Sequence, residues 1–238
     1  MIENIDEYLV GIAIGIRFRP NFSIEDSLGS LIDQILYKED SYFNPEVFPE
    51  VGGSSRERVL INNETQNTLS ISATNIILQI RFGEKIKVTD LNTINKRFEN
   101  DIINNVLGNF GITQINRIGY IKKYLFDIEE FSSVFIKKTV GETLEGVNDI
   151  NLKFSKKYPL PESMAKKDVN DYHNVIFNII KKADSEEIFI SVDYQKYFKP
   201  TLDKAKQLEF TKFLESVNHY NASTYVSWLD AYYKKDNE

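Results

Sequence analysis

The sequence predicts an α+β domain built mainly on antiparallel sheet, with amphipathic helices packed on one side of the sheet and a long helix near the C-terminus. Two observations favour this class. Apolar residues recur at every second position in several short segments, which is the period of a half-buried β-strand. Segments with helical spacing follow groups of strands instead of alternating with single strands, and this favours an antiparallel over a parallel sheet.

The first predicted strand covers residues 8–18, with the sequence YLVGIAIGIRF. The even positions carry large apolar side chains, whereas the odd positions Gly11, Ala13, Gly15 and Arg17 leave the other face nearly bare. Pro20 ends this strand. Ser23 can then cap an amphipathic helix that runs to about residue 36.

The next segments predict a loop, a meander and a helix. Residues 38–58 contain Pro45, Pro49 and a Gly-Gly pair and show no clear period, so we expect a long loop of the kind that is often functional or mobile. Strands at 58–63, 68–73 and 75–82 are expected to form an antiparallel meander. The stretch 89–111 has one apolar helical stripe, and Gly108 suits its C-terminal end.

The second half of the chain repeats this mixture. An inner strand is predicted at 114–126, then a short helical stretch after Asp127, a weak strand near 147–154 and a loop through Pro159 and Pro161. Residues 172–182 and 186–195 predict a hairpin, and apolar spacing after Pro200 predicts one long helix. Residues 1–238 can form a single domain or two subdomains, 1–126 and 127–238.

Composition excludes several classes of protein. With 42% hydrophobic and 27% charged residues the chain is an ordinary globular mixture. It has no cysteine, so it can hold no disulfide and no thiolate metal site, and a cytoplasmic location is expected. The N-terminus is acidic where a secretory signal needs lysine, and no apolar run approaches the roughly 20 residues of a membrane span, so no membrane association is expected.

The charge pattern divides the chain into two chemically different parts. The net charge is −6, so nucleic acid is not indicated as a partner by a global field, although a local basic patch remains open. All arginines precede residue 120, whereas most lysines follow it. Lysine pairs such as Lys122-Lys123 and Lys181-Lys182 stand among acidic residues, and we expect them to be solvated surface.

The arginines give the main candidate site. If the strands that carry them are neighbours in one sheet, the arginines can gather on its less apolar face, where glycines permit close approach of a ligand. A guanidinium group there suits a carboxylate, a phosphate or an acidic partner segment. The alternative is a solvated face, or internal pairs with carboxylates. The candidate ligand-binding residues are Arg17, Arg19, Arg81 and Arg117.

Signals for catalysis are weak. His173 and His219 are the only histidines and lie in no metal-binding frame, so no metal site and no cofactor is predicted. Asp193, with Lys196 close behind it, has the residue types of some nuclease sites, but the spacing is wrong and no acidic partner precedes it. The phosphate-loop, dinucleotide and hydrolase motifs do not occur.

Aromatic residues near the C-terminus give a candidate interface. Tyr225, Trp228 and Tyr232 lie at helical spacing. They either form a contact with a partner or with a second copy of the chain, since aromatics are enriched in interface cores, or they pack on the protein's own sheet.

Three short motifs, IGIRF (residues 14–18), INRIGYI (115–121) and ISVDYQKYF (190–198), resemble in their order a family of uncharacterised, sporadically distributed bacterial proteins. The resemblance implies a similar α+β fold and the distribution of an accessory or defence-associated gene, but no activity.

The leading hypothesis is a non-enzymatic bacterial cytoplasmic protein that binds a protein or an anionic ligand through the arginine-bearing face. The alternatives are a metal-dependent enzyme that acts on nucleic acid or a phosphorylated metabolite, with Asp193 as a ligand, and a structural homo-oligomer.

Overall fold

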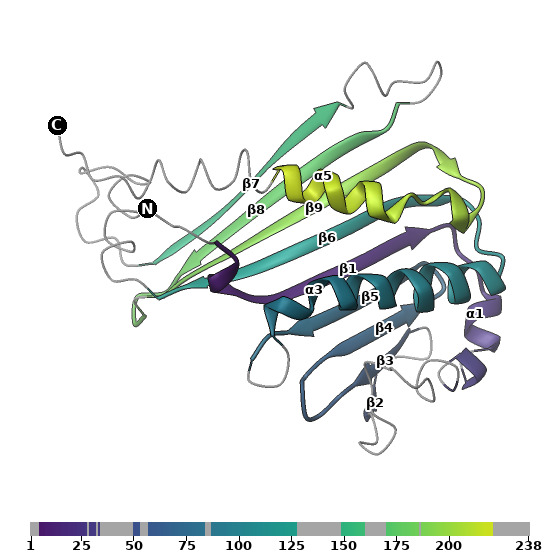
Figure 1. Cartoon of the computed structure of the whole chain (residues 1–238), viewed down its shortest axis with the longest axis horizontal. Coiled ribbons are helices and arrows are strands. Elements are labelled where there is room, and N and C mark those ends of the chain that lie inside the picture. Colours follow the sequence, from purple (N-terminus) through teal and green to yellow (C-terminus); the bar gives the residue numbers. More distant parts are fainter. Residues whose placement is uncertain are drawn as a thin grey trace.

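The computed structural model describes residues 5–27, 29–31, 33, 50–52, 57–83, 87–127, 149–159, 170–185 and 187–220. Its strands form one antiparallel sheet of nine strands in the order β2-β3-β4-β5-β1-β6-β9-β8-β7 (Figure 1). This confirms the predicted α+β class with antiparallel sheet. The strands are β1 (Leu9–Phe18), β2 (Glu50–Gly52), β3 (Glu57–Ile61), β4 (Thr68–Ser72), β5 (Asn75–Arg81), β6 (Ile115–Phe126), β7 (Ile150–Pro159), β8 (Tyr172–Lys181) and β9 (Ile188–Leu202).

The two halves of the sheet repeat one topology around the central pair β1 and β6. In the first half, β5 lies next to β1, and β4 and β3 follow outward; in the second half, β9 lies next to β6, and β8 and β7 follow outward. Each half ends in a helix after its last strand. The central pair is antiparallel and places Gly15 opposite Gly119. Corresponding strands of the two halves therefore meet in the middle of the sheet.

The two longer helical segments lie across the same face of the sheet (Figure 1). In the first, α3 (Leu91–Arg97) continues directly into η3 (Phe98–Leu107), whose turns are of the wider π type. The second is α5 (Phe210–Tyr220), which buries Phe210, Phe213 and Val217. Four short helical segments complete the described elements: η1 (Ile5–Tyr8), α1 (Ser23–Asp26), η2 (Val88–Asp90) and η6 (Ala205–Gln207).

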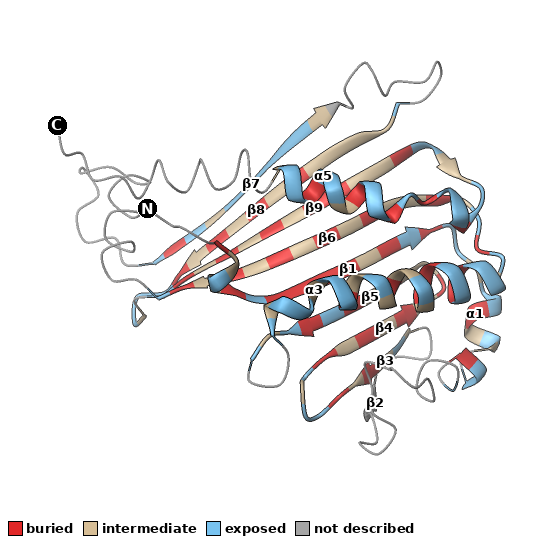
Figure 2. Cartoon of the chain, in the orientation of Figure 1, coloured by how far each residue is buried: buried red, intermediate tan, exposed pale blue. Residues whose placement is uncertain are grey.

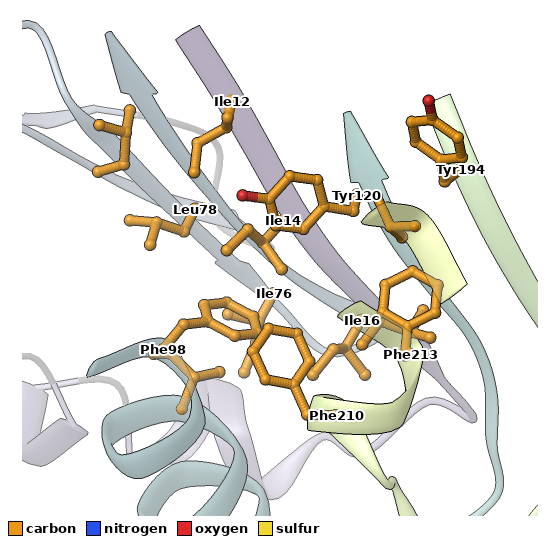
Figure 3. Close-up of a cluster of buried hydrophobic side chains, with 14 of the residues drawn as sticks. Ile12, Ile14, Ile16, Ile76, Leu78, Phe98, Tyr120, Tyr194, Phe210 and Phe213 are labelled. Carbon is orange, nitrogen blue, oxygen red and sulfur yellow. The ribbon is translucent and has the colours of Figure 1, made fainter. Parts of the chain in front are cut away.

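The hydrophobic core lies between this covered face and the helices. Ile12, Ile14 and Ile16 of β1 alternate with residues of the opposite face, as strand geometry requires, and each is at most 1% exposed. Figure 3 shows the ring of Phe98 from η3 and the rings of Phe210 and Phe213 from α5 between these helices and the isoleucines of the sheet. The rings of Phe98 and Phe210 join the two helices, with centroids 5.6 Å apart. Full burial of each such side chain contributes about 1.5–3 kcal/mol.

The opposite face of the sheet is called the open face here, because neither α3, η3 nor α5 covers it. Its positions are those that alternate with the buried ones, such as Gly15 and Arg17 on β1 and Arg117 and Gly119 on β6. Along the central strands, buried residues alternate with less buried ones (Figure 2). The open face is less apolar than the covered face, and Arg17 on it is exposed.

Most predicted strands are confirmed within one or two residues, but two edges differ. The expected loop through Pro159 begins later than predicted, because β7 runs from Ile150 to Pro159 as the edge strand beside β8. The strand predicted to end at Gln195 continues to Leu202. A proline can stand in a strand where its missing N–H is not needed for the ladder, as at Pro159 on the sheet edge.

The lysine pairs are not simply solvated surface, and that expectation was wrong for two of their members. Lys122 is 4% exposed and its Nζ lies 3.6 Å from Asp6 Oδ1. Lys181 is 5% exposed, and its Nζ donates to the carbonyl of Ser185 at 2.8 Å. Lys122 and Lys123 are adjacent residues of β6 and point to opposite faces, so one of them must turn toward the covered side. Lys181 is the last residue of β8, where it lies opposite the buried Ile188 on the covered side.

Several predictions fall outside the described residues. These are most of the loop predicted at 38–58, the helical stretch predicted after Asp127 and the part of the predicted C-terminal helix beyond Tyr220, including Tyr225, Trp228 and Tyr232. Where the predicted loop is described, it was wrong: residues 50–52 form β2, which pairs with β3. The predicted helix from Ser23 is described as α1 and at residues 29–31 and 33. Among the described residues, no helix has the length and apolar character needed to cross a membrane.

Candidate functional site

The central pair of strands brings two arginines face to face. In the register of β1 and β6, Arg17 lies directly opposite Arg117, and Gly15 lies opposite Gly119. All four belong to the open face, because the residues between them, Ile16 on β1 and Ile118 on β6, are buried on the covered side. Cross-strand neighbours have Cβ atoms about 4.5–5.5 Å apart, so the two guanidinium groups start from adjacent positions.

A shallow depression lies beside the two arginines. Its volume is about 260 Å³, and its floor is formed around Gly15 and Gly119, with Asn75, Asp193 and Gln195 on its sides. Neither glycine is required here by a positive φ. A Cβ on Gly119 would lie 3.5 Å from Asp193 Oδ1, an ordinary contact that would fill space in the depression.

A chain of hydrogen bonds fixes one wall of the depression. The Nη1 of Arg117 donates to the hydroxyl of Tyr197 at 3.4 Å, and this hydroxyl donates to Gln195 Oε1 at 2.9 Å. Gln195 Nε2 in turn donates to Asp193 Oδ2 at 2.5 Å. The guanidinium carbon of Arg117 also lies 5.8 Å from the centre of the Tyr197 ring. Arg117 is therefore held in place, whereas Arg17 is exposed.

Asp193 is the acidic group of this site. Burial raises the pKa of its carboxyl, while the hydrogen bond from Gln195 and the charges of Arg117 and Lys153 act in the opposite direction. Its Oδ2 is already taken by Gln195, which is 5% exposed. Within the described residues, no carboxylate forms an ion pair with Arg17 or Arg117. The two guanidinium groups are thus left with a net positive charge at the depression.

Basic residues outnumber acidic residues on the described part of the open face. Among the open-face residues whose side chains the structure describes, the strand registers and the alternation of side chains give the basic residues Arg17, Arg81, Arg117, Lys123, Lys153 and Lys157 and the acidic residues Glu57 and Asp193. The protein as a whole has a net charge of −6. The charges are therefore segregated, and the open face is positive on an acidic protein.

The predicted site residues are only partly gathered at the depression. Arg17 and Arg117 line it. Arg81 lies on the same face but farther along, opposite Gly11 at the other end of β1. Arg19 lies beyond the end of β1, where its Nη1 donates to Gln114 Oε1 at 3.3 Å.

Several residues of the site were missed in the sequence. Asn75, Ile77, Gln195 and Tyr197 contribute to the depression or to its hydrogen-bonded wall. Asp193, Gln195 and Tyr197 stand two residues apart in one strand and so share a face. The strand predicted at 186–195 already placed Asp193 and Gln195 on one face, whereas Tyr197 joins them only when the strand is extended beyond Gln195.

The geometry gives the metal-enzyme alternative no support. In the part of the chain that the structure describes, no three His, Asp or Glu side chains gather in a way that could hold a metal ion. His173 lies on the covered side of β8, away from the depression; its pKa is lowered to about 4, chiefly by burial and then by Lys196, with Asp171 acting the other way. The residues that line the depression instead provide positive charge and hydrogen-bonding groups.

The chain matches no protein-family model and no curated protein at a significant level. The site is therefore interpreted from its own geometry.

Proposed function

We propose that this protein is a non-enzymatic binding protein of the bacterial cytoplasm that holds an anionic group between Arg17 and Arg117. The group is a phosphate or a carboxylate, carried by a small molecule or by an acidic partner. The observation that carries this proposal is the like-charged arginine pair without a carboxylate partner among the described residues. Like charges directly opposite on neighbouring strands destabilise a sheet, and a bound anion would turn this repulsion into attraction.

The surroundings of the pair support an anion in three ways. Gly15 and Gly119 leave the space beside the guanidinium groups free. Tyr197 holds Arg117 in place, so less side-chain entropy is lost when a ligand binds. The remaining basic residues of the open face add attraction at longer range, which raises the rate of association with anions at low salt.

The test is thermal unfolding with increasing inorganic phosphate, compared with chloride at matched ionic strength. Ligand that binds only the native state stabilises it by about 2.7 kcal/mol at 100 times its Kd, so the Tm of the wild type should rise. The double variant Arg17→Gln/Arg117→Gln should lose most of this rise.

A matched double variant controls for the loss of two positive charges. Arg58 on β3 and Lys156 on β7 are both exposed and lie on the covered side of their strands. Arg58→Gln/Lys156→Gln should keep the phosphate effect of the wild type. If both double variants respond to phosphate as the wild type does, the arginine pair is not an anion site.

A further inference from the structure

The open face has a second basic cluster at the far end of the central strands. Gly11 of β1 lies opposite Arg81 of β5 on one side and opposite Lys123 of β6 on the other. Lys123 Nζ donates to Gln79 Oε1 at 3.3 Å. The pKa of Lys123 is lowered by burial and further by the charge of Arg81. Across the described ranges, no carboxylate pairs with either cation.

The two clusters are too far apart for one small anion. Arg17 and Gly11 are separated by six steps along β1, which corresponds to about 20 Å at the rise of an antiparallel strand. A ligand that fills the depression of about 260 Å³ contacts only the Arg17 and Arg117 end. A ligand that uses both clusters must be a chain with anions along its length.

The floor between the two clusters suits a chain that lies flat on the sheet. The open-face positions between them are Ala13 and Gly15 on β1, and Gly119 and Ile121 on β6. These are mostly small residues, so the backbone of a ligand can come close to the sheet. The paired strands β1 and β6 thus form a track with a small-residue floor and basic groups at both ends.

The acceptors beside the track favour nucleic acid over an acidic peptide. The carboxylate of Asp193 lies in the depression and would repel the carboxylates of an acidic peptide. Nucleobases, by contrast, carry amino groups that donate to a carboxylate, as the N4 amino group of cytosine does. Asn75 Oδ1, which belongs to the same depression, is buried and accepts no hydrogen bond from the described residues.

We infer that a single-stranded nucleic acid binds along the track of β1 and β6, with phosphates at the Arg17/Arg117 and Arg81/Lys123 clusters and a base turned toward Asp193. This inference rests on the proposed anion site. A single strand fits because its bases are free to turn into a shallow face. Proteins that recognise a duplex insert a helix or a two-stranded ribbon into its grooves. The floor of the track is formed mostly by glycine and alanine and presents no such element.

The experiment measures fluorescence anisotropy of a labelled deoxycytidine oligonucleotide of about 12 nucleotides, a length typical of single-strand sites. The wild type should bind it, with affinity that falls as salt rises. Arg81→Gln/Lys123→Gln should weaken binding at least tenfold. It should also reduce the slope of log affinity against log salt by about 1.4, because each phosphate contact to a single strand contributes about 0.7.

Three comparisons decide the identity of the ligand. Arg58→Gln/Lys156→Gln, which removes two charges from the other side of the sheet, should bind as the wild type does; an equal loss in this control would overturn the track. The matching duplex and a polyglutamate peptide should bind more weakly than the single strand, and tighter binding of either one rejects the inference. Oligodeoxycytidine should bind several times more tightly than oligodeoxythymidine, and Asp193→Asn should remove this preference.

Failure of this inference can be told apart from failure of the proposed function. Arg81→Gln/Lys123→Gln leaves the Arg17 and Arg117 end intact, so its thermal stabilisation by inorganic phosphate should equal that of the wild type. Stabilisation by phosphate without oligonucleotide binding would reject the nucleic acid and keep the anion site. Absence of both effects would reject the two together.

Discussion

The covered face and the open face of the sheet are made from the same strands but have opposite chemistry. On β1, Ile14 is fully buried under the helices, whereas its neighbour Gly15 belongs to the floor of the depression. On β6, Ile118 is buried and Arg117 lines the depression. Side chains alternate in a strand, so stability and binding are assigned to different residues of one segment. Substitutions on one face should therefore leave the function of the other unchanged.

The sharpest test of this division uses adjacent isoleucines on β5. Ile76 is fully buried on the covered face, and Ile77 lines the depression on the open face. Ile76→Ala should lower the free energy of unfolding by about 2–5 kcal/mol, because it leaves a cavity in the core. Ile77→Ala should cost less than about 1.5 kcal/mol. Urea unfolding of both variants measures the difference, and equal costs would contradict the division between the faces.

The next prediction concerns the stability of the protein at acidic pH, which depends on His173 on the covered face. The pKa of His173 is lowered to about 4, so folding favours its neutral form. Stability from this residue is present above its ordinary pKa of 6.5 and is lost as pH falls from there through about 4. The upper bound of the loss is about 3–4 kcal/mol. His173→Gln should flatten the pH dependence of the Tm across this window; an unchanged curve would show that other groups cause it.

Gly11 and Gly15 both lie on the open face, but only one of them has room for a larger side chain. A Cβ on Gly11 would lie 2.8 Å from the carbonyl oxygen of Ile80, which is backbone and cannot move aside, whereas one on Gly15 would lie 3.4 Å from the flexible side chain of Ile77. Gly11→Ala should cost about 1–3 kcal/mol in unfolding free energy. Gly15→Ala should be neutral or stabilise by about 0.5–1 kcal/mol.

The same two variants separate packing from binding. Gly15→Ala fills part of the depression, so it should weaken the stabilisation by phosphate although the protein remains fully folded. Comparison of thermal unfolding with and without phosphate measures both quantities. If Gly15→Ala destabilises the protein as much as Gly11→Ala does, the glycine at the depression serves packing and not a ligand.

Alternation predicted the elements of this fold well, but it could not predict which strands are neighbours. Strand β1 was predicted within one residue, and β6 likewise, because large apolar side chains stand at every second position. The meeting of Arg17 with Arg117 depends on the pairing of β1 with β6, which brings together residues 100 positions apart in the sequence. Periodicity within a strand contains no information about its partner.

The missed residues have a related cause. Gln195 lay inside the strand predicted at 186–195, but the face that its position implies was not followed up. Tyr197 was overlooked because that predicted strand ended too early, and strand ends are less well marked than strand centres. Lys122 was taken as surface because its pair was interpreted by composition, although its position in an alternating strand already points it toward the covered face. At both places, the alternation of side chains along the strand predicts the correct face of the sheet.

The smallest expected effect tests the electrostatic premise of the site without any ligand. Arg17 is exposed, faces Arg117 and has no carboxylate partner in the described part of the chain. Arg17→Gln should therefore raise the free energy of unfolding by about 0.2–1 kcal/mol at low salt, because it relieves a like-charge pair. The gain should shrink toward zero at 1 M salt, where the Debye length is about 3 Å.

The control for this prediction is Arg58→Gln, which removes one exposed arginine on the other side of the sheet. It changes the net charge equally but relieves no arginine pair across β1 and β6, so its effect on the Tm should be smaller. A gain that is equal in both variants would be a response to net charge alone. A gain confined to Arg17→Gln means that the unliganded sheet bears an electrostatic cost at β1 and β6, and an anion there would remove that cost.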